Sequence, residues 1–295
     1  MIYYVLPGIG MYGGIKKAFQ CADILNDCNI VTTVATPGGE SPGWFATRSP
    51  VINRADLDVR CEASDTVLFS WPPDADFVAG LAAETKVVHM QGANTRADEV
   101  LMDHSGEFHF ISHGLHMSLK LLEHGLIAPY VPNSISPIFR YSEEPKIRNS
   151  LAYMPRKGGE RIVKELKNNL TWSLQWREIH NLTEEQVAKI LKTSDIFLAI
   201  SAREAFGLPP LEAMSAMCCV VGYPGDGGLE FMHHGETAHV VANNDLEALL
   251  QALDFVITHP QYRDSLRLGG FEYSAYYTRE REQNHLLRAL ELLQL

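Results

Sequence analysis

The sequence predicts an α/β fold made of two doubly wound domains that face one another across a cleft. Short apolar runs with the length of buried strands alternate with segments whose apolar residues recur at helical spacing, a pattern typical of parallel sheets covered by helices. The chain has 295 residues, of which 46% are hydrophobic, so each of two domains can build a core. We place the first domain at residues 1–140, the second at 141–275, and a C-terminal helix at 276–295.

The first domain opens with a strand at residues 2–6, and the helix that follows carries apolar residues from Ile15 to Leu25. Residues 37–60 are rich in Gly, Pro and Arg and predict a loop. A short helix is expected at 118–124. Further strands are expected in five ranges: 30–34, 66–70, 86–90, 108–112 and 128–132.

The second domain follows a linker predicted at residues 136–150, where Pro137 and Pro145 stand among charged residues. Thr183 and Gln186 have the capping-box spacing of a helix start. Strands are expected in five ranges: 150–154, 172–176, 194–200, 219–223 and 238–241. Helices are expected at 160–166, after Thr183, after the strand at 194–200, and from Asp245 through 258.

The net charge, the cysteine spacing and the length of the apolar runs restrict which partners and which cellular compartment are expected. The net charge is −11 and the pI is near 5.5, which argues against nucleic acid as the main partner because a duplex binder needs an extended basic surface. The five cysteines have no spacing typical of a zinc site or a redox pair. The first residues lack the features of a signal peptide, and no apolar run approaches the ~20 residues of a membrane span. We expect a cytoplasmic protein, with peripheral membrane contact left open.

A glycine motif near the start of the chain suggests a nicotinamide oxidoreductase at first sight. Gly8, Gly10 and Gly13 match G-x-G-x-x-G between a strand and a helix. A dinucleotide site also needs an acidic residue about 20 positions further on, at the end of the second strand, to bind ribose. The first acid there is Glu40, beyond two glycines, so the dinucleotide interpretation is disfavoured. Two interpretations of these glycines stay open: a loop at Gly13 and Gly14 that binds phosphate or an acceptor, and a tight turn without a binding role.

The most informative run is residues 201–214, where Glu204 and Glu212 stand eight positions apart around a glycine and a Pro-Pro pair. The strand before it and the helix after it make this a strand–loop–helix connection with a carboxylate at each end of the loop. Carboxylates accept hydrogen bonds from the hydroxyls of a sugar or a ribose. The run therefore suits a ligand that carries both hydroxyls and phosphate.

The phosphate part of such a ligand would lie at the helix start. Leu208 precedes a proline, which disfavours the α region, and Pro209 and Pro210 suit the first helical positions. Glu212 is expected in the first turn, where the helix dipole favours a carboxylate. Backbone N–H groups beside a helix N-terminus form an anion site. Three amides are expected to point at one place there, those of Phe206, Gly207 and Leu208.

This run resembles the E-x7-E signature of retaining glycosyltransferases of family four, which have the GT-B fold. Neighbouring segments agree: residues 131–135 resemble the end of the family's first domain, 153–158 its basic loop, and 220–230 its following strand and turn. The resemblance covers most of the chain and is strongest from 130 to 240. It implies two facing Rossmann-like domains, a C-terminal helix that returns to the first, and an enzyme that transfers a sugar from a nucleotide diphosphate sugar with retention.

The resemblance also implies roles for individual residues. Glu204 would hold the donor sugar and Glu212 the ribose, while Arg156 and Lys157 neutralise the leaving diphosphate together with the three amides. The base of the donor would lie near His180 and Leu182. In the first domain, a loop and two polar residues would complete the site: Gly13 and Gly14 on the donor phosphate or acceptor, and Gln91 and His113 on the side of the sugar and acceptor. The basic loop lacks an arginine that family members commonly have some residues before the lysine, and Arg156 is expected to substitute for it.

No metal or organic cofactor is expected. His109, His113 and His116 fall on a predicted strand, a loop and a helix, and Asp56-Leu-Asp58 lies in the loop-like region, so neither forms a metal motif. The nucleotide sugar is the co-substrate, and its base, its sugar, the acceptor and the oligomeric state stay open. Because the first domain is short and the basic loop is abbreviated, one alternative function stays open: a catalytically reduced GT-B protein that binds a nucleotide or sugar without transferring it.

Overall fold

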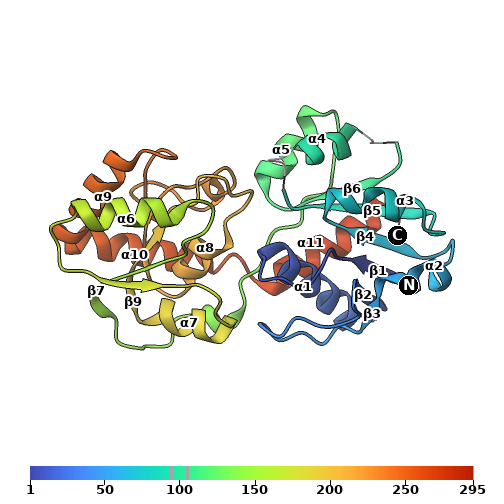
Figure 1. Cartoon of the computed structure of the whole chain (residues 1–295), viewed down its shortest axis with the longest axis horizontal. Helices are drawn as coiled ribbons and strands as arrows, with labels where there is room; N and C mark the ends of the chain where they lie inside the picture. The colour runs from blue at the N-terminus through green and yellow to red at the C-terminus, as the bar shows by residue number, and fades with distance from the viewer. Residues whose placement is uncertain (93–95, 104–105, 295) are drawn as a thin grey trace. The chain divides into compact units, whose positions relative to one another are not determined.

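The computed structural model describes residues 1–92, 96–103 and 106–294 and divides the chain into two compact units. The first unit comprises Met1–Asn133 and Arg279–Leu295, and the second comprises Ser134–Thr278. Each unit has its own parallel sheet and its own covering helices (Figure 1). The predicted α/β fold with two parallel sheets is confirmed. The first unit ends seven residues before the predicted boundary at 140, and its last segment begins three residues after the predicted 276.

Within the described residues, the sheet of the first unit has the strand order β3-β2-β1-β4-β5-β6, and every neighbouring pair is parallel. β1 is buried along its whole length because helices cover both faces of the sheet. The strands are β1 (Ile2–Val5), β2 (Thr32–Thr36), β3 (Val51–Asn53), β4 (Thr66–Phe69), β5 (Thr85–Met90) and β6 (His109–Ser112). The helices are α1 (Gly13–Asp27), α2 (Leu57–Arg60), α3 (Ala75–Ala79), α4 (Arg96–Asp103), α5 (Leu115–Glu123) and α11 (Arg279–Leu292).

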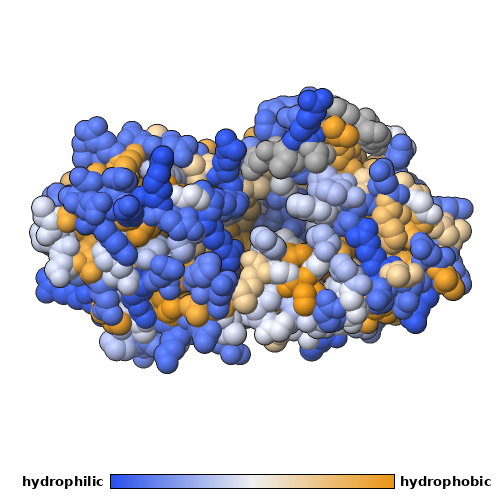
Figure 2. Space-filling view, viewed as in Figure 1, coloured by the Kyte–Doolittle hydropathy of each residue, from blue (hydrophilic) through white to orange (hydrophobic). Residues whose placement is uncertain are grey.

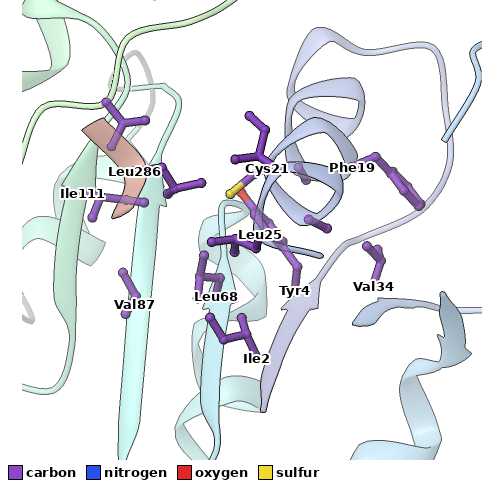
Figure 3. Packing of buried hydrophobic residues seen from close by; sticks show 14 of the residues in the cluster. Ile2, Tyr4, Phe19, Cys21, Leu25, Val34, Leu68, Val87, Ile111 and Leu286 are labelled. Atoms are coloured by element: carbon purple, nitrogen blue, oxygen red, sulfur yellow. The ribbon is translucent and has the colours of Figure 1, made fainter. Parts of the chain in front are cut away.

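The core of the first unit joins this sheet to its first and last helices. Figure 3 shows Tyr4 and Ile2 of β1 close to Leu25 of α1, with Leu286 of α11 in the same cluster. The helix predicted from apolar spacing is confirmed as α1, and the five residues of that pattern are all buried in this cluster: Ile15, Ala18, Phe19, Ala22 and Leu25. The last helix therefore shares a core with the first strand.

A buried ion pair also joins α1 to α11. Lys17 Nζ donates to Glu282 Oε2 at 2.5 Å, and both side chains are 1% exposed. Burial lowers the pKa of Lys17, and the carboxylate of Glu282 opposes that shift. Burial removes both charges from water at a cost in free energy, which their mutual attraction offsets. Either charge alone would therefore destabilise the folded unit.

The second unit has the strand order β11-β10-β9-β7-β8 within the described residues, again all parallel. Its strands are β7 (Ile147–Tyr153), β8 (Gln175–Glu178), β9 (Ser194–Ala199), β10 (Cys219–Gly222) and β11 (Ala238–Val240). Its helices are α6 (Gly159–Asn169), α7 (Glu184–Thr193), α8 (Leu208–Ser215), α9 (Leu246–Thr258) and α10 (Pro260–Ser274). The predicted capping box is present, because the side chains of Thr183 and Gln186 each accept a hydrogen bond from the other's backbone amide.

Several segments differ from the sequence prediction. β8 lies at Gln175–Glu178 rather than 172–176, and β7 begins at Ile147, inside the predicted linker. Residues 37–60 contain β3 and α2, which are too short for a periodic pattern. Residues 128–132 form only an isolated bridge from Tyr130 to Ser112, because two prolines in this range supply no N–H to a ladder. No element was predicted for α10, because Gly269 and Gly270 argue against a helix. These glycines let α10 approach backbone closely: a Cβ on Gly269 would lie 2.2 Å from the carbonyl oxygen of Glu236.

The described residues on the face in Figure 2 form no large hydrophobic patch that would mark a binding site. The face in Figure 2 carries mostly hydrophilic residues, and hydrophobic ones occur in small scattered groups. Among the residues that the structure describes, no helix combines the length and apolar character needed to cross a membrane.

Removal of one partner of the buried ion pair should destabilise the first unit. Lys17→Met leaves the Glu282 carboxylate buried without its cation, which costs about 3–5 kcal/mol of unfolding free energy. The double variant Lys17→Met/Glu282→Leu removes both charges and should recover most of that loss. Urea unfolding of the three proteins measures the effect. Lys120→Met, which removes an exposed pair with Glu123, serves as control and should change stability by less than about 1 kcal/mol.

Candidate functional site

The carboxyl ends of the second unit's strands gather the predicted donor-side residues at one edge of the sheet. Because β7, β8, β9 and β10 are all parallel, the loops that follow them leave from the same edge. Four loops meet this description: 154–158, 179–183, 200–207 and 223–227. Ligands of open α/β sheets bind at this edge.

Glu204 and Lys157 form an ion pair across two of these loops. Lys157 Nζ donates to Glu204 Oε2 at 2.9 Å and to the carbonyl oxygen of Arg203 at 2.8 Å. Ser201 Oγ donates to the other carboxylate oxygen of Glu204 at 2.8 Å. Lys157 is 52% exposed and Glu204 28% exposed, so both groups are accessible to a ligand. Arg156 is exposed next to Lys157 in the same loop.

A glycine-rich turn after β10 holds the backbone of the Glu204 loop. The carbonyl oxygen of Glu204 accepts hydrogen bonds from the amides of Asp226 and Gly227, at 3.1 and 2.9 Å. A Cβ on Gly227 would lie 1.8 Å from the carbonyl oxygen of Ala205, so only glycine allows this approach. Sequence reasoning assigned no role to Gly227. The signal was present in the glycines of residues 220–230, which resemble the family's turn.

The loop ends at the N-terminus of α8. Gly207 has φ 88°, in the left-handed region, and α8 begins at Leu208 with both prolines in its first turn. Two expectations were wrong here. Leu208 is helical, and Glu212 is the fifth residue of α8 rather than part of its first turn. Among the described residues, no backbone carbonyl outside α8 accepts a hydrogen bond from the amides of Gly207 or Leu208. These two amides are therefore suited to bind an anion.

The other donor-side candidates lie around the same edge. Phe206 is buried, and its ring packs against those of Phe231 and Tyr277. Glu212 is 6% exposed on α8. His180 is exposed and Leu182 half-buried in the loop after β8. Each of these residues belongs to the second unit.

The four remaining candidates belong to the first unit, at the carboxyl edge of its own sheet. Gly13 and Gly14 are the first two residues of α1. A Cβ on Gly14 would lie 2.4 Å from Gln91 Oε1, so the glycine makes room for this side chain. Gln91 Nε2 donates to the hydroxyl of Tyr4 at 3.2 Å. The structure therefore brings Gly14 and Gln91 together, and Tyr4 is a polar partner that sequence reasoning missed.

Two buried histidines lie beside this group. Tyr4 Oη and His89 Nδ1 are 2.8 Å apart, and the rings of His89 and His113 pack edge to face with centroids 5.2 Å apart. Burial lowers the pKa of His89 to about 3, with a smaller contribution from Lys17. Burial also holds the pKa of His113 well below its usual range. Both rings are therefore neutral at physiological pH, which suits contacts with uncharged hydroxyls.

The other candidate metal ligands remain dispersed. His109 lies on β6, His113 follows it, and His116 lies on α5. Asp56 precedes α2 and Asp58 lies within it. In the described part of the chain, no group of three or more His, Cys, Asp or Glu residues is arranged to hold a metal ion.

The sequence of the second unit is similar to sequences of known proteins. Residues 158–271 match the family model of glycosyl transferases group 1. The chain is 33% identical over 103 residues, 34% of its length, to an alpha-1,6-glucosyltransferase of Actinobacillus pleuropneumoniae. It is 42% identical over 65 residues, 22% of its length, to the lipopolysaccharide core biosynthesis mannosyltransferase LpcC of Rhizobium leguminosarum. These alignments span less than a third of each relative, 31% and 18%.

Solved structures show the fold of the whole chain. The Anabaena protein HepE, in complex with UDP and glucose, is similar with a TM-score of 0.76 and 11% identity over 98% of this chain and 99% of that one. A sucrose-phosphate synthase from Thermosynechococcus elongatus gives 0.74 with 12% identity over 99% and 98%. The lipopolysaccharide glycosyltransferase WaaG gives 0.70 with 14% identity over 97% and 99%. The fold of the chain is therefore the GT-B fold of these solved structures.

Gly227→Ala should disrupt the loop that carries Glu204. The added Cβ would overlap the carbonyl oxygen of Ala205, so the turn and the loop must separate and the hydrogen bonds to Glu204 weaken. We expect a loss of about 2 kcal/mol or more in unfolding free energy, measured by urea unfolding. The control is Gly43→Ala, because nothing lies within 4 Å of a Cβ there. Equal stability of both variants would contradict this role for Gly227.

The buried histidines should make the first unit sensitive to acid. Between pH 6.5 and about 3 the unfolded chain binds a proton at His89 that the folded chain does not, so the unfolding free energy falls as the pH falls. The slope contributed by one such residue is about 1.4 kcal/mol per pH unit. Urea unfolding between about pH 7.5 and 5 measures it. His89→Gln should reduce this slope, whereas His109→Gln, at an exposed position of β6, should leave it unchanged. The same slope in His89→Gln and the unaltered protein would overturn the assignment.

Proposed function

We propose that this chain is a retaining glycosyltransferase that transfers a hexose from a nucleotide diphosphate sugar to an acceptor hydroxyl. The observation that carries the proposal is the Glu204–Lys157 pair, which lies beside the N-terminus of α8 within the segment that matches the glycosyl transferase family model. The E-x7-E spacing of Glu204 and Glu212 supports membership of family four. The hexose is inferred from the names of the two curated relatives, a glucosyltransferase and a mannosyltransferase.

The leaving diphosphate is stabilised in this proposal by charges and dipoles that are already in place. Lys157 and Arg156 supply cations, and the amides at the start of α8 supply hydrogen-bond donors. Groups oriented before the reaction need no reorganisation as negative charge grows on the leaving oxygen, which is often the largest contribution to catalysis. On binding, the ammonium of Lys157 divides its interactions between Glu204 and phosphate. The same groups support a reaction without a metal ion.

The two glutamates hold the sugar parts of the donor. Glu204, oriented by Ser201 and Lys157, accepts hydrogen bonds from the hydroxyls of the transferred sugar and stabilises positive charge at its anomeric carbon. Glu212 holds the ribose, and the backbone near His180 and Leu182 contacts the base. The acceptor hydroxyl attacks the same face of the sugar that the diphosphate leaves. A leaving phosphate oxygen accepts the hydroxyl proton, so retention requires no covalent enzyme intermediate.

The first unit contributes the acceptor side. Gly13 and Gly14 close on the donor phosphate or the acceptor, and Gln91 and the neutral ring of His113 contact the sugar and acceptor hydroxyls. A neutral histidine can donate or accept a hydrogen bond without attracting phosphate. The acceptor is a glycan, a lipid-linked sugar or a small molecule, and peripheral contact with a membrane and a cytoplasmic location are compatible with each.

Substitution of either member of the central pair should nearly abolish transfer. Glu204→Ala removes the acceptor for the sugar hydroxyls, and Lys157→Ala removes a cation from the diphosphate. Each should lower kcat by about 10²–10³-fold with little change in folding. A thermal-shift panel of nucleotide sugars first identifies the donor, and release of free nucleotide then measures turnover.

Lys164→Ala is the matched control, because it removes an exposed lysine from α6 of the same unit and should retain full activity. Full activity in Glu204→Ala or Lys157→Ala would overturn the site. Tight nucleotide binding without turnover in the unaltered chain would instead support the alternative, a catalytically reduced GT-B binding protein. Stabilisation by NAD rather than by nucleotide sugars would reject both.

A further inference from the structure

A second candidate binding site lies in the second unit between the C-terminal ends of α6 and α9, which pack side by side (Figure 1). It is an open groove of about 480 Å³. Two aromatic residues that line it are exposed, Trp172 at 39% and Phe255 at 41%. Two exposed aromatic rings in one groove place apolar surface where a ligand can contact both of them.

The aromatic rings of the groove are held in fixed orientations. Trp172 Nε1 donates to Asp254 Oδ1 at 2.8 Å, which ties the indole to α9. The rings of Phe255 and His259 stack at 4.0 Å with an interplanar angle of 21°, and His259 Nδ1 lies 2.9 Å from the carbonyl oxygen of Phe255. Fixed rings lose little conformational entropy when a ligand binds to them.

Polar side chains of the groove have unused hydrogen-bonding capacity. Asp254 is an exposed residue that accepts from Trp172 through Oδ1, and its Oδ2 can accept from a hydroxyl. Asn169 donates through Nδ2 to the carbonyl oxygen of Glu165, which leaves its side-chain oxygen as an acceptor. Gln251, exposed on α9, adds an amide. The groove thus combines aromatic faces with acceptors that suit hydroxyl donors.

The charge of the groove selects among ligands that contain rings. No lysine or arginine lines it, and Asp254 carries a negative charge, so a nucleotide or another phosphate-bearing ligand would be repelled. The C-terminal ends of α6 and α9 point the negative ends of their dipoles to the same region. A neutral ligand with C–H faces and many hydroxyls meets every requirement, because its C–H groups pack on the rings and its hydroxyls donate to the acceptors.

The groove also lies apart from the donor-side loops. Thr171 and Trp172 precede β8, whereas the loop with His180 follows it. In a parallel sheet these positions belong to opposite edges. We propose that the groove is an additional glycan-binding site, which takes a sugar ring of a neutral oligosaccharide at the edge of the sheet opposite to Glu204. The inference does not depend on the proposed transferase activity.

The test is saturation-transfer NMR and titration of the whole chain with three neutral hexasaccharides: maltohexaose, isomaltohexaose and mannohexaose. We expect at least one to bind with a Kd of about 0.1–5 mM. Trp172→Ala and Phe255→Ala should each weaken that binding by about tenfold or more, because an aromatic contact is lost. Asp254→Asn should weaken it less, since it keeps the size of the side chain.

Two controls separate the groove from other surfaces. Tyr276→Ala removes an aromatic residue that is 66% exposed elsewhere in the second unit and should leave oligosaccharide binding unchanged. Glu204→Ala should also leave it unchanged, although the proposed transfer is lost. Melting temperatures establish that each variant is folded. The proposal is overturned if none of the three hexasaccharides binds more tightly than about 5 mM, or if binding is the same in folded Trp172→Ala and Phe255→Ala as in the unaltered chain.

Discussion

The contact between two backbone loops at the carboxyl edge of the second sheet constrains the rest of the candidate site. The carbonyl oxygen of Glu204 accepts two amides of the turn after β10, and Gly227 lies too close to Ala205 for any side chain. The Glu204 loop is therefore fixed at three places: by β9, by α8 and by this turn. A carboxylate on a loop held in this way meets a ligand in a set orientation, which is the condition for electrostatic preorganisation.

The two units use different physical means to place their polar groups. In the second unit, glycine turns and backbone hydrogen bonds support a pair of charged side chains that stay in contact with water. In the first unit, Tyr4, His89 and His113 are buried, and burial keeps the histidines neutral. Neutral buried groups suit recognition of hydroxyls, whereas accessible charges suit phosphate. This difference matches the proposed division between an acceptor side and a donor side.

The sequence predicts most of the strands and the position of Glu204 in the loop between β9 and α8, because both depend on local patterns. Apolar runs bounded by turn residues specify β1, β4, β5 and β9, and the capping box at Thr183 is a local signal. The pairing of Glu204 with Lys157 involves residues 47 positions apart, and only the sheet topology brings them together. The same holds for Tyr4 and His89, and for Lys17 and Glu282. α10 was missed because its glycines disfavour a helix locally, while close packing on Glu236 requires them.

A parallel sheet with antiparallel helices has two electrostatically different edges, and this asymmetry supports the proposal that one unit binds two chemical classes of ligand. At the carboxyl edge, α8 begins, and its free amides join Lys157 to favour phosphate. At the opposite edge α6 and α9 end, and their terminal carbonyls add to the charge of Asp254. Phosphate is repelled there, while hydroxyl donors are favoured and Trp172 and Phe255 offer apolar faces. In the proposed transferase, a neutral glycan held at one edge would not compete with the anionic donor at the other.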